Sequence, residues 1–159
     1  MSTVKKSFWP YIAGFLDADG SIYVQLKQNS TYRYKFQIAP SVVFYQKKTE
    51  KAGLPEIQKK LALGYLRNRK DGMMELVIND RKSIRKLLTE TKPYLILKKP
   101  QAKLMIRILN MMDKLTSIKR FISLTKLIDQ FRDLNYSKKR TVDSQVVCRH
   151  LKNIGLLTP

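Results

Sequence analysis

The sequence predicts an α+β fold in which a core of order αββαββα precedes a helical tail. Two observations carry this prediction: apolar residues recur at helical spacing over residues 8–18 and again after residue 100, and four segments between them alternate apolar with polar side chains. Because each alternating segment has one apolar face, we expect an antiparallel sheet with helices on one side. The 159 residues suit one domain spanning 1–159, with a core at about 8–113 and a tail at about 118–157.

The first half of the core is a helix followed by two long strands. Residues 8–18 form the helix, and residues 21–28 form a half-buried strand because they alternate strictly. A turn at 29–31 leads into a second strand over 32–46, where Pro40 should mark a bulge or an irregular end of the ladder.

The second half of the core repeats this order. A charged segment becomes helical within 47–63, two short strands at 64–69 and 74–79 flank a turn, and a helix over 80–91 ends before Pro93. The tail contains helices at about 101–113, 118–134 and 143–153.

The charge balance points to a polyanionic partner. The chain carries 32 Lys and Arg against 12 Asp and Glu, a formal net charge of +20, so nucleic acid is the first candidate partner and a membrane surface the second. No apolar run approaches the roughly 18 residues of a spanning helix, and we see no secretory signal. One cysteine, Cys148, excludes an internal disulfide framework and fits a reducing compartment. One histidine, His150, excludes His-rich metal sites, and we assign both residues structural roles.

One face of the predicted sheet is polar and cationic. Side chains of this kind hydrogen-bond to base edges and phosphates, and a two-stranded ribbon fits the major groove of B-DNA. A merely solvated sheet face is the alternative, which the strong excess of cations disfavours. The residues are Tyr23, Gln25, Lys27, Arg33, Lys35, Gln37, Arg67 and Arg69.

The segment IAGFLDADG, residues 12–20, ends an apolar helix with two carboxylates. Asp17 and Asp19 fit turn capping, since Asp-x-Asp-Gly is frequent turn chemistry. An EF-hand is excluded because apolar residues would occupy its first and last ligand positions. Ala13-Gly14 weakens a helix, so we expect another backbone to pack closely there.

This segment resembles the nine-residue signature of the LAGLIDADG homing endonucleases. Six of its nine positions are identical, and the other three are conservative apolar changes. The segments GYLRNR at 64–69, KPYLILKKPQA at 92–102 and LIDQFRDLNYSKKR at 127–140 resemble compact single-motif members found in organellar introns. The resemblance covers about residues 8–157 and implies the family's fold, with a curved antiparallel sheet that binds double-stranded DNA.

The resemblance also implies a homodimer, since the chain holds one copy of the motif. In the family two such helices pack along a two-fold axis, which requires a DNA site with pseudo-two-fold symmetry, on the order of 20 base pairs. The residues expected at this contact are Ile12, Ala13, Gly14, Leu16 and Asp17.

Metal-dependent phosphodiester hydrolysis follows from the same resemblance. Asp19 is implied as the direct metal ligand and Ala18 as a ligand through its backbone carbonyl, whereas Asp17 is expected to cap the helix and shape the turn. Hard oxygen ligands select Mg²⁺. Mn²⁺ is expected to substitute, and Ca²⁺ to support binding without efficient cleavage.

Further positions match the periphery of the family's active site. Gln46 is implied to order the attacking water, and Lys98 to stabilise phosphate charge or modulate the water. A basic residue expected near position 50 is replaced by Glu50, so Lys48 or Lys51 takes that role or the chain lacks it.

DNA reading is assigned to the cationic face and its surroundings. Arginine suits guanine, glutamine suits adenine, and Glu75 suits an acceptor role toward cytosine. A basic loop in the tail is expected to grip phosphates. The candidates are Tyr23, Gln25, Lys27, Asn29, Tyr32, Arg33, Lys35, Gln37, Arg67, Arg69 and Glu75 on or near the sheet, and Lys138, Lys139 and Arg140 in the tail.

The implied activity is a site-specific double-strand break at an intron insertion site, leaving short 3′ overhangs. One alternative is a maturase that binds the host intron RNA, with or without nuclease activity. Another is a basic DNA-binding module without chemistry, which intact Asp19, Gln46 and Lys98 disfavour. The bias to Lys, Ile, Asn and Tyr fits AT-rich coding in a mitochondrion or chloroplast and synthesis within the organelle. No membrane partner is expected.

Overall fold

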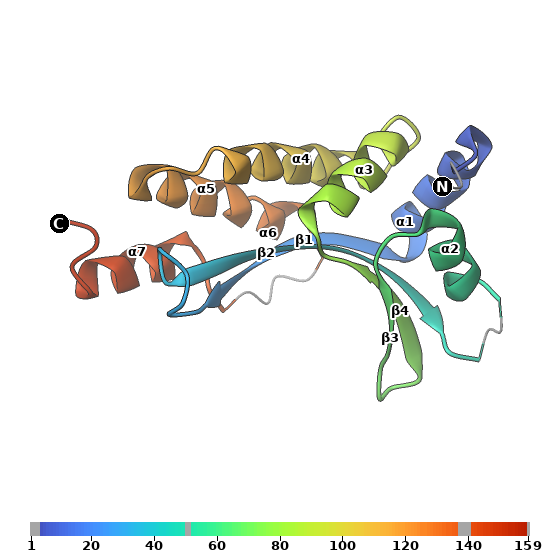
Figure 1. Cartoon of the computed structure of the whole chain (residues 1–159), viewed down its shortest axis with the longest axis horizontal. Coiled ribbons are helices and arrows are strands. Elements are labelled where there is room, and N and C mark those ends of the chain that lie inside the picture. Colours follow the sequence, from blue (N-terminus) through green and yellow to red (C-terminus); the bar gives the residue numbers. More distant parts are fainter. Residues whose placement is uncertain (1–3, 50–51, 137–140, 159) are drawn as a thin grey trace. The chain divides into compact units, whose positions relative to one another are not determined.

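The computed structural model describes residues 4–49, 52–136 and 141–158 and contains the predicted αββαββα order (Figure 1). A 3-10 turn, η1 (Lys6–Phe8), leads into α1 (Trp9–Asp19). The other core elements are β1 (Gly20–Gln28), β2 (Phe36–Lys47), α2 (Leu54–Leu61), β3 (Tyr65–Asn68), β4 (Met73–Ile78) and α3 (Arg81–Thr91). The helices that follow are α4 (Lys99–Asp113), α5 (Ile118–Asp129), α6 (Phe131–Leu134) and α7 (Ser144–Asn153).

The four strands form one sheet in the order β1-β2-β4-β3. β4 pairs antiparallel with β2 and with β3, so that Tyr45 and Arg67 lie on either side of Glu75. Because side chains alternate across a strand, Phe44 and Leu76 point to the opposite face, and both are fully buried. The register therefore separates an apolar face from a face that carries the predicted polar residues.

The first of two compact units takes in the chain up to Ile22 and from Pro40 to Lys103. Within it α1 packs against α3, and α2 packs against β3 and β4 (Figure 1). Leu16 of α1 and Leu87 of α3 are fully buried, since the apolar residues of each helix recur on one side. This unit contains every residue of the predicted catalytic centre.

The second unit takes in Tyr23–Ala39 and the chain from Leu104 onward. In it α5 packs against α7. The ring of His150 on α7 packs at right angles to that of Phe36, with centroids 5.3 Å apart, so His150 has the structural role that the sequence predicts. β1 and β2 each contribute residues to both units.

The second strand begins later than the sequence predicts. Residues 32–35 form turns, in which the N–H of Asn29 donates to the carbonyl of Lys35 at 2.8 Å and Lys35 has a φ of +61°. The apolar-polar alternation simply continues into these turns. β2 then runs through Pro40, so the strand does not end there, and the alternative of a bulge at Pro40 stays a prediction.

The long tail helix predicted over 118–134 is divided at Gln130 into α5 and α6. Within the described ranges, we find no helix with the length and apolar character needed to cross a membrane.

Candidate functional site

α1 carries Asp19 to its exposed C-terminal end. Gly20 follows in an extended conformation, and its N–H donates to the carbonyl of Leu16. A Cβ at Gly20 would lie 2.7 Å from that carbonyl oxygen, so glycine allows the strand to begin directly after the helix. The last carbonyls of a helix carry partial negative charge. Together with the carboxylate of Asp19 they make this end of α1 suited to a cation.

Asp17 does not cap its own turn. Its carboxylate accepts three backbone N–H groups from the segment that enters α4, those of Ile96 at 2.7 Å, Leu97 at 3.2 Å and Lys98 at 2.9 Å. The predicted capping role therefore exists, but it serves a segment about 80 residues away, in the manner of an N-terminal cap.

Lys98 returns this contact, since its ammonium group donates to the backbone carbonyl of Asp17. Burial lowers the pKa of Lys98 below the usual lysine value, while the negative charges of Asp17 and Asp19 act in the opposite direction. The structure therefore brings the two motif carboxylates and the predicted basic residue into one electrostatic group at the end of α1.

Gln46 lies near the end of β2, and its Oε1 accepts the N–H of Leu54 at 3.0 Å. The preceding Gly53 has a φ of +105°, and a Cβ at that position would overlap the side-chain amide of Gln46. The start of α2 thus fixes Gln46. The side-chain contacts given for Gln46 are to this segment, while its backbone pairs with Met74 on β4.

Which residue takes the basic role expected near position 50 stays a prediction. Lys48 is exposed, and its N–H donates to the carbonyl of Gly72 at 2.9 Å, in the turn between β3 and β4. Glu50 and Lys51 lie outside the residues that the structure describes. The same holds for the tail residues Lys138, Lys139 and Arg140.

The residues predicted at the dimer contact differ in exposure. Ile12, Ala13 and Leu16 are fully buried in the core of the single chain. Gly14 is exposed, and in the described part of the chain no atom beyond its own helix turns lies within 4 Å of a Cβ built there. Asp17 is half-buried.

Large apolar side chains are exposed on α1 and on the segment that Asp17 holds. Tyr11 is 57% exposed, Ile96 82% and Leu97 67%. Exposed apolar groups on one surface are typical of an interaction site.

The predicted nucleic-acid residues lie in strands and turns. On β1, Gln25 and Lys27 are exposed and Tyr23 is half-buried, in alternation with buried apolar residues, as predicted. The turn that follows is closed by Asn29, whose Oδ1 accepts the N–H of Thr31 at 3.1 Å.

Residues 32–37 place their side chains less regularly. The Nζ of Lys35 donates to the carbonyl of Ser30 at 3.1 Å, and the guanidinium of Arg33 lies 5.3 Å from the centre of the Tyr34 ring. Tyr32 is 43% exposed, and Gln37 on β2 is half-buried.

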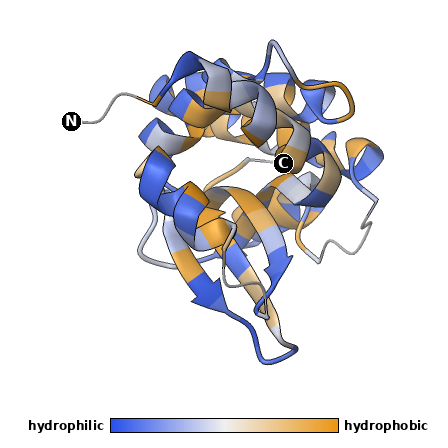
Figure 2. Ribbon diagram, turned by 90° about the vertical axis from the view of Figure 1, so that its right-hand side faces the viewer, coloured by the Kyte–Doolittle hydropathy of each residue, from blue (hydrophilic) through white to orange (hydrophobic). Residues whose placement is uncertain are grey.

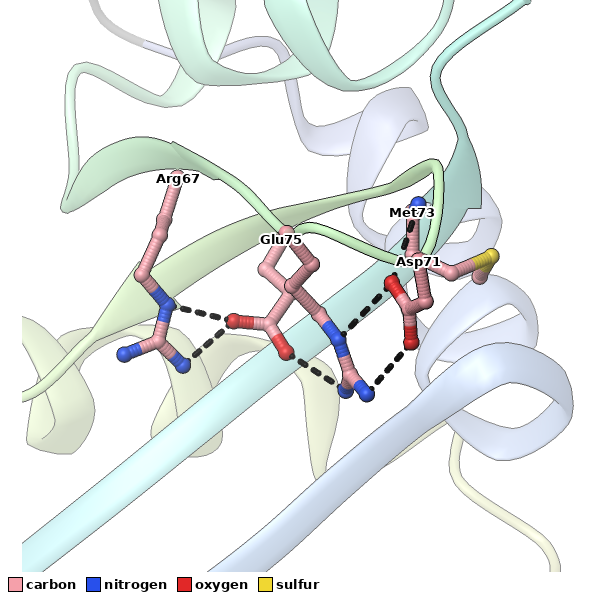
Figure 3. A network of polar contacts seen from close by, with 5 residues as sticks. Arg67, Asp71, Met73 and Glu75 are labelled. Carbon is pink, nitrogen blue, oxygen red and sulfur yellow. Dashed lines mark hydrogen bonds and ion pairs between the residues drawn. The ribbon is translucent and has the colours of Figure 1, made fainter.

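The β3–β4 hairpin carries the third part of the cationic face, and the turn at its tip is hydrophilic (Figure 2). Arg67 donates through Nε to Oε2 of Glu75 at 2.6 Å, and Arg69 donates through a terminal nitrogen to Oε1 at 3.1 Å (Figure 3). Glu75 is only 3% exposed. Its carboxylate therefore holds two arginines in place, which competes with the acceptor role toward cytosine that we predict for it.

Two residues that the sequence did not single out belong to these sites. Asp71 lies in the hairpin turn and pairs with Arg69 at 2.6 Å. Gly53 makes room for Gln46. The only signals in the sequence were the Asp-Gly pair of the turn and a glycine before Pro55, both of which predict loops and no more.

In the part of the chain that the structure describes, no three His, Cys, Asp or Glu side chains gather as a metal site. Since the carboxylate of Asp17 is engaged with backbone N–H groups, one chain offers the carboxylate of Asp19 at this end of α1.

Comparison with known proteins places these features in context. Residues 12–105 match the family model described as LAGLIDADG endonuclease. The chain is 33% identical to DNA endonuclease I-CreI of Chlamydomonas reinhardtii over 146 residues, 89% of this chain and 87% of that protein. It is 34% identical to DNA endonuclease I-CvuI of Chlorella vulgaris over 145 residues, 91% of this chain and 90% of that protein.

Solved structures resemble this chain over most of its length. The homing endonuclease I-CvuI in complex with its target in the presence of Ca matches with a TM-score of 0.90 and 33% identity, covering 96% of this chain and 98% of that one. The same enzyme with the I-CreI target and Mg, in which the DNA is not cleaved, matches equally. The archaeal intron-encoded homing endonuclease I-Vdi141I complexed with DNA has a TM-score of 0.83 at 20% identity, covering 96% of this chain and 100% of that one, and so shares the fold.

Proposed function

Because the chain belongs to the LAGLIDADG endonuclease family and is a homing endonuclease that cleaves DNA, we propose that it acts as a homodimer on a long pseudo-palindromic site. The site is the insertion site of its own intron, and the product is a double-strand break with short 3′ overhangs. The observation that carries this proposal is the end of α1, where exposed Asp19 lies within the electrostatic reach of Lys98.

Asp19 holds a divalent cation in this proposal, together with the backbone carbonyl of Ala18. The donor chemistry fits, because carboxylate and carbonyl oxygens are hard ligands and the helix end is itself partially negative. Mg²⁺ is the ion of the reaction, Mn²⁺ substitutes for it, and Ca²⁺ supports binding without efficient cleavage. When bound, the metal supplies water activation and neutralises charge on the attacking and leaving oxygens.

The chain's own residues supply the remaining functions. Gln46, held by Leu54, orients the attacking water with its amide. Lys98 stabilises the charge of the scissile phosphate and, through its bond to the Asp17 carbonyl, sets the position of Asp19. Because burial makes its charge costly in the unbound state, an approaching phosphate gains more from this ammonium group than from an exposed one.

The second subunit completes the metal site by contributing its own Asp19. We propose that the two subunits meet through the exposed side of α1 and the adjoining segment, at Tyr11, Gly14, Ile96 and Leu97. Gly14 supports this because, among the described residues outside its own helix turns, none has an atom within 4 Å of a Cβ built there, which leaves room for a second backbone.

The polar face of the sheet reads DNA in each half-site. Tyr23, Gln25 and Lys27 on β1 and the arginines of the hairpin contact bases or phosphates. Asn29, Tyr32, Arg33, Lys35 and Gln37 extend this surface, and the tail residues Lys138, Lys139 and Arg140 grip phosphates. We also place the protein in the mitochondrion or chloroplast that encodes its intron, on the bias of its composition toward AT-rich codons.

Selection from a randomised duplex library tests the proposal. Wild-type protein is bound to the library in Ca²⁺, the retained duplexes are sequenced, and Mg²⁺ is then added. We expect a pseudo-palindrome cut on both strands. Asp19→Asn should bind it and lose cleavage by about 10³-fold or more, while Glu90→Gln, the same change of charge at an exposed position of α3, should cut normally.

Two results would count against the proposal. If no duplex is enriched, the protein has no specific duplex DNA target. The host intron RNA would then be the next ligand to test. A duplex that Asp19→Asn cuts as fast as wild type would show that the catalytic centre is elsewhere.

A further inference from the structure

We propose that Asp71 is a positioning residue that fixes the guanidinium of Arg69 for the recognition of one base pair in each half-site. The inference rests on the proposed function, since it assigns a task to one contact of a DNA-reading surface. It goes beyond that function because Asp71, an acid in the turn of the hairpin, has no part in binding a polyanion by charge.

Arg69 lies between the carboxylates of Asp71 and Glu75, both of which are labelled in Figure 3. Its Nε and one terminal nitrogen donate to Asp71 at 3.2 and 2.6 Å, and its other terminal nitrogen donates to Glu75 at 3.1 Å. A guanidinium group has five N–H groups, so these bonds leave one on each terminal nitrogen. Two such groups are what bidentate recognition of guanine O6 and N7 requires, and 45% of the side chain is exposed.

Asp71 fixes the plane of this group better than Glu75 does. Glu75 gives Arg69 a single bond and shares its carboxylate with Arg67. The two parallel bonds to Asp71 have the bidentate geometry that defines an orientation. An arginine ordered before binding loses less side-chain entropy on meeting its base, so a fixed plane favours the correct base over others.

The same contacts remove attraction for phosphates. Arg67, Glu75, Arg69 and Asp71 follow one another as a row of alternating charges whose formal sum is zero. Desolvation acts to raise the pKa of Asp71, but the N–H of Met73 and the guanidinium of Arg69 outweigh it and hold that pKa below its ordinary value, so Asp71 is charged at neutral pH. These four residues thus offer base-reading donors with little of the net charge that drives sequence-blind binding.

Asp71 also has a second contact, since its Oδ1 accepts the N–H of Met73 at 3.2 Å within the turn. Two substitutions separate the contacts. Asp71→Asn keeps an oxygen for the N–H of Met73 and removes the charge that holds Arg69. Asp71→Glu keeps the charge and moves the carboxylate away from the turn. A positioning role and a merely structural role therefore predict opposite rankings of the two variants.

The experiment measures binding to every single-base variant of the DNA site that wild-type protein selects, in Ca²⁺ and at several salt concentrations. For Asp71→Asn we expect preference at one base pair per half-site to fall about tenfold, with the other positions unchanged. Binding to unrelated DNA should strengthen, with a salt dependence steeper by about one ion per hairpin. Asp71→Glu should keep more of the preference, and Glu90→Gln should match wild type.

A second measurement, hydrogen exchange of the Arg69 side chain, needs no DNA. The Nε–H of Arg69 should exchange with solvent faster in Asp71→Asn than in wild type, because its acceptor is weakened. If Asp71→Asn keeps the wild-type profile while Asp71→Glu loses it, Asp71 acts on the turn alone and the proposal is overturned. An Asp71→Asn variant that loses preference equally at every base position would also overturn the proposal.

Failure of this inference is distinguishable from failure of the proposed function. A wild-type protein that selects no duplex overturns both. A sharp wild-type profile beside an unchanged Asp71→Asn profile overturns only the role of Asp71.

Discussion

Asp17 and Lys98 are joined by two reciprocal hydrogen bonds. The carboxylate of Asp17 accepts the backbone N–H of Lys98 at 2.9 Å, while the ammonium group of Lys98 donates to the backbone carbonyl of Asp17. The N–H groups of Ile96 and Leu97 share the same carboxylate. The last turn of α1 is therefore tied to the start of α4, and Asp19 lies two residues beyond this connection.

Alanine at the two motif aspartates should separate structure from chemistry. Asp17→Ala leaves three N–H groups without their charged acceptor, so we expect the free energy of unfolding to fall by about 2 kcal/mol. Asp19→Ala relieves repulsion at the C-terminal end of a helix but removes a charge that favours the ammonium group of Lys98. The two effects oppose one another, so stability should change by less than about 1 kcal/mol, although cleavage is lost. Denaturant unfolding of both variants measures this. Equal stability of the two would contradict the assignment.

The charge of Asp19 should be visible in the titration of Lys98. Because that carboxylate raises the pKa of Lys98 against the effect of burial, Asp19→Asn should lower the pKa of Lys98 further. The Cε resonance of ¹³C-labelled lysine follows the titration by NMR. Glu90→Gln serves as the control, because Glu90 is exposed on α3 and is not among the groups that shift the pKa of Lys98. A pKa of Lys98 that does not change in Asp19→Asn would mean that the two groups do not interact.

The lowered pKa of Lys98 also determines how its contribution to stability depends on pH. Burial places the pKa of folded Lys98 below the value of 10.5 of the unfolded chain. Between these two pKa values the unfolded state binds more protons, so the contribution of Lys98 to stability rises with pH in that window. Its unfavourable contribution is fully present below the folded pKa and disappears as the pH reaches 10.5. Lys98→Met should therefore lose its stability advantage over wild type as the pH rises through the window.

Local patterns in the sequence predicted the elements well, because helical spacing and strict alternation depend on neighbours along the chain. They failed where the partner of a residue is distant. Asp17 followed by Asp19 and Gly20 has the pattern of a local turn, and nothing near it indicates that its carboxylate binds Ile96 about 80 residues later. The apolar spacing of α1 likewise does not indicate that Ile12 is fully buried within its own chain.

Turns and cross-strand register limit what the sequence predicts about the sheet. Arg33 and Lys35 continue the alternation of β2, but the chain has turned before Phe36, and Lys35 adopts a left-handed conformation. On the hairpin, the alternation correctly placed Arg67 and Glu75 on one face. Their ion pair depends on cross-strand register, which the sequence alone does not define.

Substituting Gly53 should displace Gln46. In Gly53→Ala the new Cβ overlaps the amide of Gln46 and the residue must hold a φ of +105°, so we expect kcat to fall by about tenfold to a hundredfold with DNA binding retained. The backbone strain should also cost about 1–3 kcal/mol. Gly155→Ala is the matched control, because Gly155 has a φ of +72° with open space around it. Single-turnover cleavage that is equal in the two variants would exclude a role for the position of Gln46.

Charge on the exposed apolar segment should disrupt the homodimer without unfolding the chain. Leu97 is 67% exposed in a single chain, so Leu97→Asp should be tolerated by the monomer, whereas burial of an unpaired carboxylate between two subunits is unfavourable. We expect the dissociation constant of the dimer to rise about a hundredfold, measured by sedimentation at several protein concentrations. Leu156→Asp, at a position that is 44% exposed in the other unit, should leave the dimer intact. Since one chain supplies a single Asp19, monomeric Leu97→Asp should also fail to cut DNA; a monomer that cuts both strands would refute the shared metal site.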